Sequence, residues 1–193
     1  RGTELSGKRL GFIGFGRIAK GVGRVAIALG MELHAFDPYL KAKVARDHSC
    51  QLHSSVDEVF RRCTHITVHC NLSDETHHLV NAKRIGLMTG RGADGIECGN
   101  HLVNCARGGI VDEQAVLDAL ESGQLASVSL DVFENEPTTA DNRLMQHHAF
   151  QGTPHIGAAT LEAQTRIGFE MAELLIDFFS GKTPKSVVNR DVL

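Results

Sequence analysis

Three ionisable side chains of different kinds each come shortly after a stretch that reads as a strand. Arg107 follows such a stretch at 101–105, Glu136 follows one at 127–132, and His155 follows one at 149–152. A cation can hold a carboxylate, an imidazole can move a proton on and off an oxygen, and an acid can orient the imidazole. Together they suit hydride transfer at a carbon that bears oxygen. Taken singly, each has a plain alternative: a surface cation, a solvated loop acid and a structural histidine.

A fingerprint for a dinucleotide lies near the start of the chain, in Arg9 to Asp37. An apolar run enters the turn Gly14-Phe15-Gly16. Apolar residues at helical spacing follow, and Gly30 ends that helix. These helical positions are Ile18, Val22, Val25, Ala26 and Leu29. A second apolar run then ends on Asp37. Strand, glycine turn, helix, strand and acid form the first unit of a dinucleotide-binding domain.

Each position in this fingerprint has a physical reason. Gly14 permits the tight turn, and Gly16 lets the backbone approach a pyrophosphate that a Cβ atom would push away. The N–H groups of residues 16 to 19 then face the pyrophosphate at a helix N-terminus. Asp37 can accept hydrogen bonds from both ribose hydroxyls of NAD, and it would repel the 2′-phosphate of NADP. The alternatives are a βα turn without a ligand and a different adenosyl ligand in the same crevice.

Strands and helices alternate along the whole chain. The expected strands are 9–14, 32–36, 50–52, 65–69, 101–105, 127–132 and 149–152, and the expected helices are 17–29, 41–47, 54–62, 81–88, 112–122 and 161–180. Ser54 with Asp57 is a candidate N-cap pair for the third helix, and Asp112 is the expected cap of the fifth. The alternation predicts an α/β fold with a doubly wound parallel sheet, a Rossmann-type dinucleotide-binding domain.

Two stretches depart from this rhythm. Thr89 to Gly99 carries four glycines without a hydrophobic period, which is typical of a flexible surface loop. Leu161 to Ser180 is a long amphipathic helix, and its apolar stripe is expected to pack against the core.

Composition narrows the class of protein. The chain has 193 residues, a net charge of −3 without long runs of one sign, and no tryptophan. Nucleic acid and membrane are therefore not expected as partners. Five cysteines without C-x-x-C spacing indicate free thiols in a reducing compartment, which we take to be the cytoplasm. The eleven histidines do not form the spacing of a metal site, so no metal is expected.

Two longer segments, GTELSGKRLGFIGFGRI and NCARGGIVDE, make the chain resemble the D-isomer-specific 2-hydroxyacid dehydrogenases from Gly2 to about Asn189. The resemblance implies an NAD-dependent oxidation of a D-2-hydroxyacid, with 3-phosphoglycerate as the expected substrate. Another 2-oxoacid, such as hydroxypyruvate or glyoxylate, is an alternative. So is an NAD(H)-sensing binding module of the corepressor type.

The resemblance also implies a part for each site residue. Arg107 binds the substrate's carboxylate, His155 is the acid/base, and Glu136 hydrogen-bonds its imidazole. Asp131 holds the nicotinamide carboxamide. The other residues implied to touch the cofactor are Gly14, Gly16, Arg17, Ile18, Asp37, Cys70, Cys105, Ala106, Gly157 and Ala158.

The family usually inserts this domain within a substrate domain. The expected division is therefore an NAD-binding domain at 1–186 and the start of the returning substrate-domain segment at 187–193, with the rest of the substrate domain absent. The chain alone is expected to bind NAD and to turn over weakly. Family members usually form dimers through the nucleotide domain. Two departures stand out: Asn71 replaces the family's usual proline, and the loop at 89–99 is longer than its counterpart.

Overall fold

The computed structural model describes residues 2–184 and 186–189. The chain forms two compact units, one that ends at Pro154 and one that begins at His155. The first unit contains the whole sheet, and the second contains the long C-terminal helix. Each unit is described by itself.

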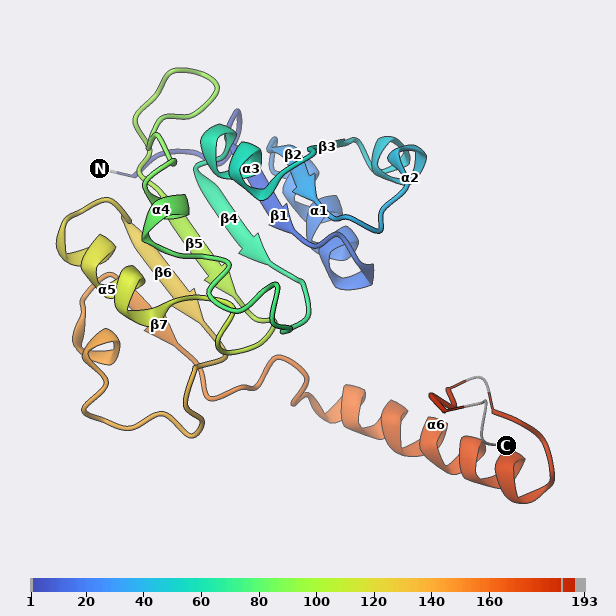
Figure 1. Cartoon of the computed structure of the whole chain (residues 1–193). Coiled ribbons are helices and arrows are strands. Elements are labelled where there is room, and N and C mark those ends of the chain that lie inside the picture. The colour runs from blue at the N-terminus through green and yellow to red at the C-terminus, as the bar shows by residue number, and fades with distance from the viewer. Residues whose placement is uncertain (1, 185, 190–193) are drawn as a thin grey trace. The chain divides into compact units, whose positions relative to one another are not determined.

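The first unit is built on a seven-stranded parallel sheet in the order β3-β2-β1-β4-β5-β6-β7 (Figure 1). Its strands are β1 (Arg9–Ile13), β2 (Glu32–Phe36), β3 (Cys50–Leu52), β4 (His65–Val68), β5 (His101–Asn104), β6 (Ser127–Leu130) and β7 (Phe150–Gly152). The direction in which strands are added reverses between β1 and β4, and the carboxyl ends of strands at such a point form a ligand crevice. The predicted doubly wound parallel sheet is confirmed, with all seven strands at the expected places.

Helices lie on both faces of this sheet (Figure 1). They are α1 (Arg17–Ala28), α2 (Ala42–Asp47), α3 (Val56–Arg62), α4 (Ala82–Ile85) and α5 (Glu113–Glu121), and α6 (Leu161–Phe179) follows in the second unit. All six were expected, although α4 is a single turn instead of the eight residues predicted. A short 3-10 helix, η1 (Arg143–Gln146), was not foreseen.

The core is divided between the two faces because consecutive strand residues point in opposite directions. Phe12 packs with Phe15, Ala19 and residues of α2 on one side, while the next residue, Ile13, belongs to the larger cluster under α3, α4 and α5. A strand buried on both faces must be apolar without alternation, as Phe12 and Ile13 are. Packing on both faces therefore holds the central strands in place, and the candidate site lies at their carboxyl ends.

The buried face of helix α1 is formed by small residues, and its large apolar residues lie on another face. Its buried residues are Ala19, Gly23 and Ala26. Of the five positions that indicated the helix, only Ala26 is buried, and Ile18, Val22, Val25 and Leu29 are exposed. The reason is the close approach of helix and sheet: a Cβ atom on Gly23 would lie 2.8 Å from Leu33 Cδ1.

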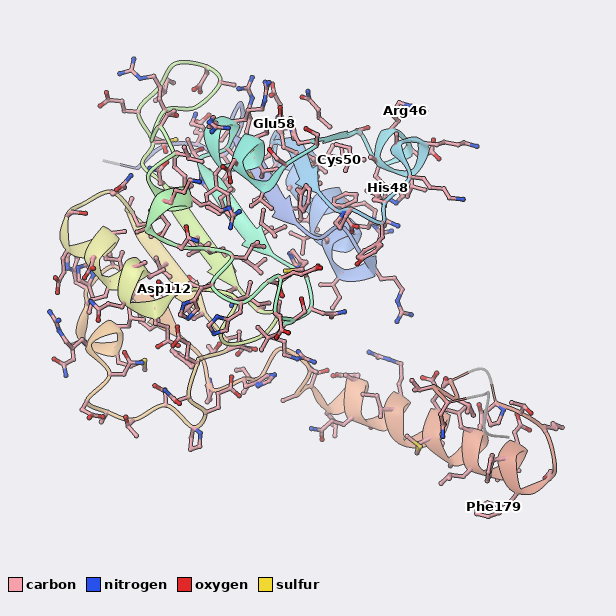
Figure 2. The ribbon with its side chains drawn as sticks, in the orientation of Figure 1. Arg46, His48, Cys50, Glu58, Asp112 and Phe179 are labelled. Atoms are coloured by element: carbon pink, nitrogen blue, oxygen red, sulfur yellow. The ribbon has the colours of Figure 1, made fainter. Side chains whose placement is uncertain are left out.

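Of the two helix caps that were predicted, the cap of α5 is confirmed and the cap of α3 is wrong. Asp112 caps α5 by accepting the Ala115 N–H, and Figure 2 shows its place at the start of that helix. Helix α3 is capped by Ser55, which accepts the Glu58 N–H, so the prediction of Ser54 was wrong by one residue. Ser54 instead donates to the Glu58 carboxylate through its backbone N–H at 3.1 Å. The Glu58 side chain thus bonds the residue before the cap, while its backbone N–H bonds the cap itself.

The glycine-rich loop at 89–99 has contacts across it and at its tip. Arg91 and Glu97 form an antiparallel bridge and an ion pair across it. Asp94 at its tip pairs with Lys8, whose side chain is only 2% exposed. The contact joins residues 86 positions apart, so local sequence patterns gave no sign of it.

The second unit is dominated by α6, and none of this helix's residues is buried. Phe169 is 71% and Phe179 is 84% exposed, and Figure 2 shows the Phe179 side chain pointing away from the helix. Within the described residues of this unit, the apolar stripe is therefore not buried by a core. Thr160 caps the helix by accepting the Ala163 N–H.

Candidate active site

A crevice of about 320 Å³ opens at the carboxyl ends of the central strands. Three segments line it, and each directly follows a strand: the first turn of α1 after β1, the residues after β4, and the residues after β5. The lining residues are Gly16, Arg17, Ile18, Ala19, His69, Cys70, Asn71, Cys105, Ala106 and Arg107. The strand order places this crevice at the switch point, where a doubly wound sheet binds its ligand.

The glycine turn has the geometry that a pyrophosphate needs. Gly14 has φ of +86°, and a Cβ atom there would lie 2.9 Å from the backbone N of Cys70. Gly16 is the N-cap of α1, and nothing in the chain lies within 4 Å of the place where its Cβ would be. The first turn of α1 contains no acidic residue, and it begins with the cation Arg17. The open space, the helix N-terminus and the cation fit a bound pyrophosphate.

Asp37 is held in place without the cofactor. One of its carboxylate oxygens accepts the Phe15 N–H at 2.9 Å, and the other accepts the Tyr39 N–H at 2.9 Å. The acid at the end of β2 is thereby tied to the glycine turn at the end of β1. A carboxylate oriented in advance loses little entropy when it binds ribose hydroxyls.

The segment after β5 brings Arg107 to the crevice. The Arg107 side chain is exposed, and its Nη1 donates to the Ala106 carbonyl at 2.6 Å. Cys70 and Cys105 lie in the same crevice, and burial raises the pKa of both thiols. Raised values keep both cysteines as neutral thiols at neutral pH, so they form a weakly polar wall and are poor nucleophiles.

Asp131 and Glu136 follow β6. Asp131 is 5% exposed, and its Oδ1 accepts a hydrogen bond from Thr153 Oγ1 at 2.6 Å. Glu136 precedes a cis proline, and its Oε1 accepts the Phe133 N–H at 2.9 Å. Both carboxylates are therefore fixed by hydrogen bonds on the same unit as Arg107.

His155, Gly157 and Ala158 belong to the second unit. His155 directly follows Pro154 and has φ of +53°, a left-handed conformation that is uncommon for a residue with a side chain. Such conformations recur at functional sites.

Three residues that line the crevice, Ala19, His69 and Asn71, were not among the expected site residues. Ala19 was expected only to offer its backbone N–H at the start of the helix. Asn71 was noted only as a departure from the family pattern. The His69 ring contacts the Phe12 ring in a tilted arrangement with centroids 5.7 Å apart, and its Nε2 forms a hydrogen bond with Thr67 Oγ1 at 2.9 Å. Burial lowers the pKa of His69 to about 4, so it is neutral at pH 7. Its place directly after β4 was the available signal, because strand ends line the crevice.

No helix in the described residues is long and apolar enough to cross a membrane. Within the same residues, no group of three or more His, Cys, Asp or Glu side chains is arranged to hold a metal ion.

The geometry agrees with comparisons to known proteins. Residues 1–157 match the family described as D-isomer specific 2-hydroxyacid dehydrogenase, NAD binding domain. The chain belongs to this family. Its fold, its glycine turn and its strand-end crevice are therefore those of an NAD-binding domain.

Individual relatives support the same conclusion. The chain is 41% identical over 188 residues to D-3-phosphoglycerate dehydrogenase of Bacillus subtilis, covering 97% of this chain and 34% of that protein. It is also 41% identical to the enzyme of the same name from Rattus norvegicus, covering 100% of this chain and 34% of the relative. Among solved structures, D-lactate dehydrogenase from Aquifex aeolicus, complexed with NAD and lactic acid, superposes with a TM-score of 0.79. It is 30% identical, and the match covers 93% of this chain and 55% of that one. The chain thus spans about a third of these curated relatives.

Proposed function

We propose that the chain carries the cofactor-binding and catalytic residues of an NAD-dependent D-2-hydroxyacid dehydrogenase whose substrate is 3-phosphoglycerate. One observation carries the proposal: a single crevice joins the Gly16 turn to the segment that presents Arg107, with Asp37 already oriented beside the turn. The 41% identity to enzymes named D-3-phosphoglycerate dehydrogenase favours that substrate over other hydroxyacids.

Bound NAD supplies the acceptor for a hydride from the carbon that bears the hydroxyl group. The exposed guanidinium of Arg107 binds the substrate's carboxylate and the oxygen on the reacting carbon. An arginine suits this task because its planar fork matches the two oxygens of a carboxylate.

We assign the role of acid/base to His155, which takes the proton from the substrate hydroxyl during oxidation and returns it during reduction. Glu136 is assigned as the partner of that imidazole, because a carboxylate bonded to one ring nitrogen fixes the tautomer that leaves the other nitrogen for the substrate. The hydrogen bond from Phe133 N–H already orients the Glu136 side chain. Asp131 is assigned to the nicotinamide carboxamide.

Domain limits are also part of the proposal. We assign 1–186 to the NAD-binding domain and 187–193 to the start of a returning substrate-domain segment. Residues 190–193 of that segment lie outside the described residues. Much of the substrate would then be contacted by residues outside these 193, so we expect these residues by themselves to turn over weakly.

We infer that two copies associate through α1. The exposed face of this helix carries Ile18, Val22, Val25 and Leu29, which are 75%, 39%, 62% and 51% exposed. Apolar residues at this spacing form a continuous stripe, and such stripes on soluble domains are often interfaces. Replacement of Val25 by Asp should convert a dimer into a monomer in light scattering. The five free thiols are consistent with a cytoplasmic protein.

The test of function is calorimetric titration with NADH and NADPH, followed by assays with D-hydroxyacids. Tight binding of NADH, weak binding of NADPH and a preference for 3-phosphoglycerate over D-lactate and D-glycerate are expected. The Arg107→Gln variant should keep its NADH affinity and lose turnover. Failure to bind NADH would refute the proposal, and equal turnover of all three acids would refute the assigned substrate.

A further inference from the structure

Asn104 is a buried polar residue at a position that the sheet would otherwise fill with an apolar side chain. It is the last residue of β5 and is 1% exposed, like Leu102 two positions before it. Its strand partners, Val68 and Leu130, are apolar and buried. A carboxamide in such a place is costly unless it forms its hydrogen bonds. The bonds that Asn104 makes therefore indicate why an asparagine stands there.

Both ends of the Asn104 carboxamide bond the short segment that carries Arg107. Oδ1 accepts the Ala106 N–H at 2.9 Å, and Nδ2 donates to the Arg107 carbonyl at 2.9 Å. One side chain thus holds the N-terminal end of Ala106 and the C-terminal end of Arg107. The chain leaves β5 at this point, and the two bonds fix the direction in which Arg107 projects.

The surrounding backbone leaves this segment little freedom to move as a whole. A Cβ atom on Gly108 would lie 1.7 Å from the Phe133 carbonyl oxygen, so the residue after Arg107 lies directly against the segment after β6. The Asn104 carbonyl accepts the Asp131 N–H at 3.0 Å. Asn104 therefore joins the end of β6 to the loop that presents the guanidinium.

We propose that Asn104 is a positioning residue for substrate binding, and that its carboxamide holds the Arg107 backbone so that the guanidinium meets the carboxylate of a 2-oxoacid. The proposal rests on the assignment of Arg107 to the substrate carboxylate. It does not require Asn104 to touch the substrate or the cofactor.

An asparagine is the side chain that this task requires. A neutral carboxamide offers a donor and an acceptor on one planar group. Aspartate of the same shape retains the acceptor for Ala106 N–H and loses the donor to the Arg107 carbonyl. Leucine of similar volume loses both. The two substitutions therefore separate the donor bond from the acceptor bond.

The experiment measures the affinity of the NADH-loaded chain for oxalate, a dianion that resembles a 2-oxoacid, by titration calorimetry. The variants are Asn104→Asp, Asn104→Leu, Arg107→Gln and the double variant Asn104→Leu/Arg107→Gln. Asn100 supplies a matched control: it is 5% exposed just before β5, and it accepts the Gly90 N–H and donates to the Gln124 carbonyl. NADH affinity and Tm are recorded for each variant.

We expect Asn104→Leu to weaken oxalate binding about 10- to 100-fold, because a displacement of roughly 1 Å at such a group has an effect of this size. We expect a loss of similar size from Arg107→Gln, because it removes a charge-assisted hydrogen bond worth about 1.5–3 kcal/mol. The NADH affinity should change less than about threefold. The double variant should bind oxalate as Arg107→Gln does, since the two residues act as a unit. Asn100→Leu should lower the Tm and leave oxalate binding unchanged. Leucine adds no charge at position 104. If Asn104→Leu and Asn104→Asp both lose oxalate affinity, the loss is therefore not an effect of added charge.

The outcomes separate the two proposals. If Arg107→Gln weakens oxalate binding and neither Asn104 variant does, the role of Asn104 is refuted and that of Arg107 stands. Independent, multiplicative losses in the double variant, or an equal loss in Asn100→Leu, would also refute the role of Asn104. If Arg107→Gln has no effect, or the unsubstituted chain has no affinity for oxalate, the proposed function fails and the inference fails with it. If Asn104→Leu does not fold, Asn104→Ala replaces it in the single and the double variant, because alanine also removes both hydrogen bonds without adding charge.

Discussion

The three glycines around the first turn of α1 allow a test of where the cofactor lies. Gly14, Gly16 and Gly21 are each replaced by alanine, which adds one Cβ atom at a known place. At Gly16 the Cβ meets no atom of the chain within 4 Å, and φ of −77° suits alanine. At Gly21 it also meets nothing. At Gly14 it lies 2.9 Å from backbone atoms of His69 and Cys70, with φ of +86°.

The expected effects on folding differ accordingly. Gly21→Ala should stabilise the helix by about 0.5–1 kcal/mol. Gly16→Ala should be near neutral, because the weaker N-cap of alanine is offset by the lower entropy of its unfolded chain. Gly14→Ala should cost at least about 2 kcal/mol, since the left-handed conformation alone costs about 1–2 kcal/mol and the backbone contact adds to it. For a chain of this size, that loss lowers the Tm by roughly 4–8 °C.

The expected effects on NADH binding follow a different order. A Cβ atom on Gly16 occupies the space assigned to the pyrophosphate, and one or two charge-assisted N–H bonds are lost. Each is worth about 1.5–3 kcal/mol, so the loss of a single bond raises the Kd by roughly tenfold to 150-fold, and the loss of two bonds raises it further. Calorimetric titration with NADH and thermal unfolding are the two assays. Unchanged NADH affinity in Gly16→Ala, or an equal loss in Gly21→Ala, would refute the placement of the cofactor.

Three further predictions follow from other contacts. Asp37→Asn should narrow the preference for NADH over NADPH at least about tenfold, because the charge that repels a 2′-phosphate is removed; an unchanged ratio of the two Kd values would contradict this. Burial lowers the pKa of His34, His65 and His69 to about 4, so the unfolded chain binds more protons between pH 6.5 and 4. The free energy of unfolding should therefore be intact above about pH 6.5, fall by roughly 1.4 kcal/mol per pH unit for each histidine, and level off below pH 4. Urea titrations at several pH values measure this free energy. The His34→Gln variant should show a smaller fall between pH 6.5 and 4. Asp94→Ala should lower the Tm more than Glu97→Ala, because Asp94 pairs with a lysine that is 2% exposed while the Glu97 side chain is 79% exposed; equal changes in Tm would count against the anchoring of the loop.

Much of the fold could be predicted from local patterns in the sequence. The positions of the strands, and the glycine turn with its terminal acid, depend on residues close together in the chain. A parallel sheet then brings the carboxyl ends of its strands to one edge, so Gly16, Cys70, Cys105 and Arg107 could be assigned to one crevice. Local rules failed at Ser54, because neighbouring serines offer the same cap and only backbone geometry selects Ser55.

Tertiary structure decided what depends on contacts between distant residues. The spacing of apolar residues in α1 indicated a helix but not which of its faces meets the sheet. Small residues face the sheet because the helix packs so closely that a Cβ atom on Gly23 would lie 2.8 Å from Leu33. The buried partner of Asp94 lies 86 residues away at Lys8. Asn104 begins the segment NCARGGIVDE, but its role in holding Arg107 gave no signal in the sequence, since its two hydrogen bonds exist only where the chain turns out of β5. The sequence alone determined the elements and the chemistry at their ends. Packing decided which face each element buries and which side chain aims Arg107, because both depend on distances that no local pattern records.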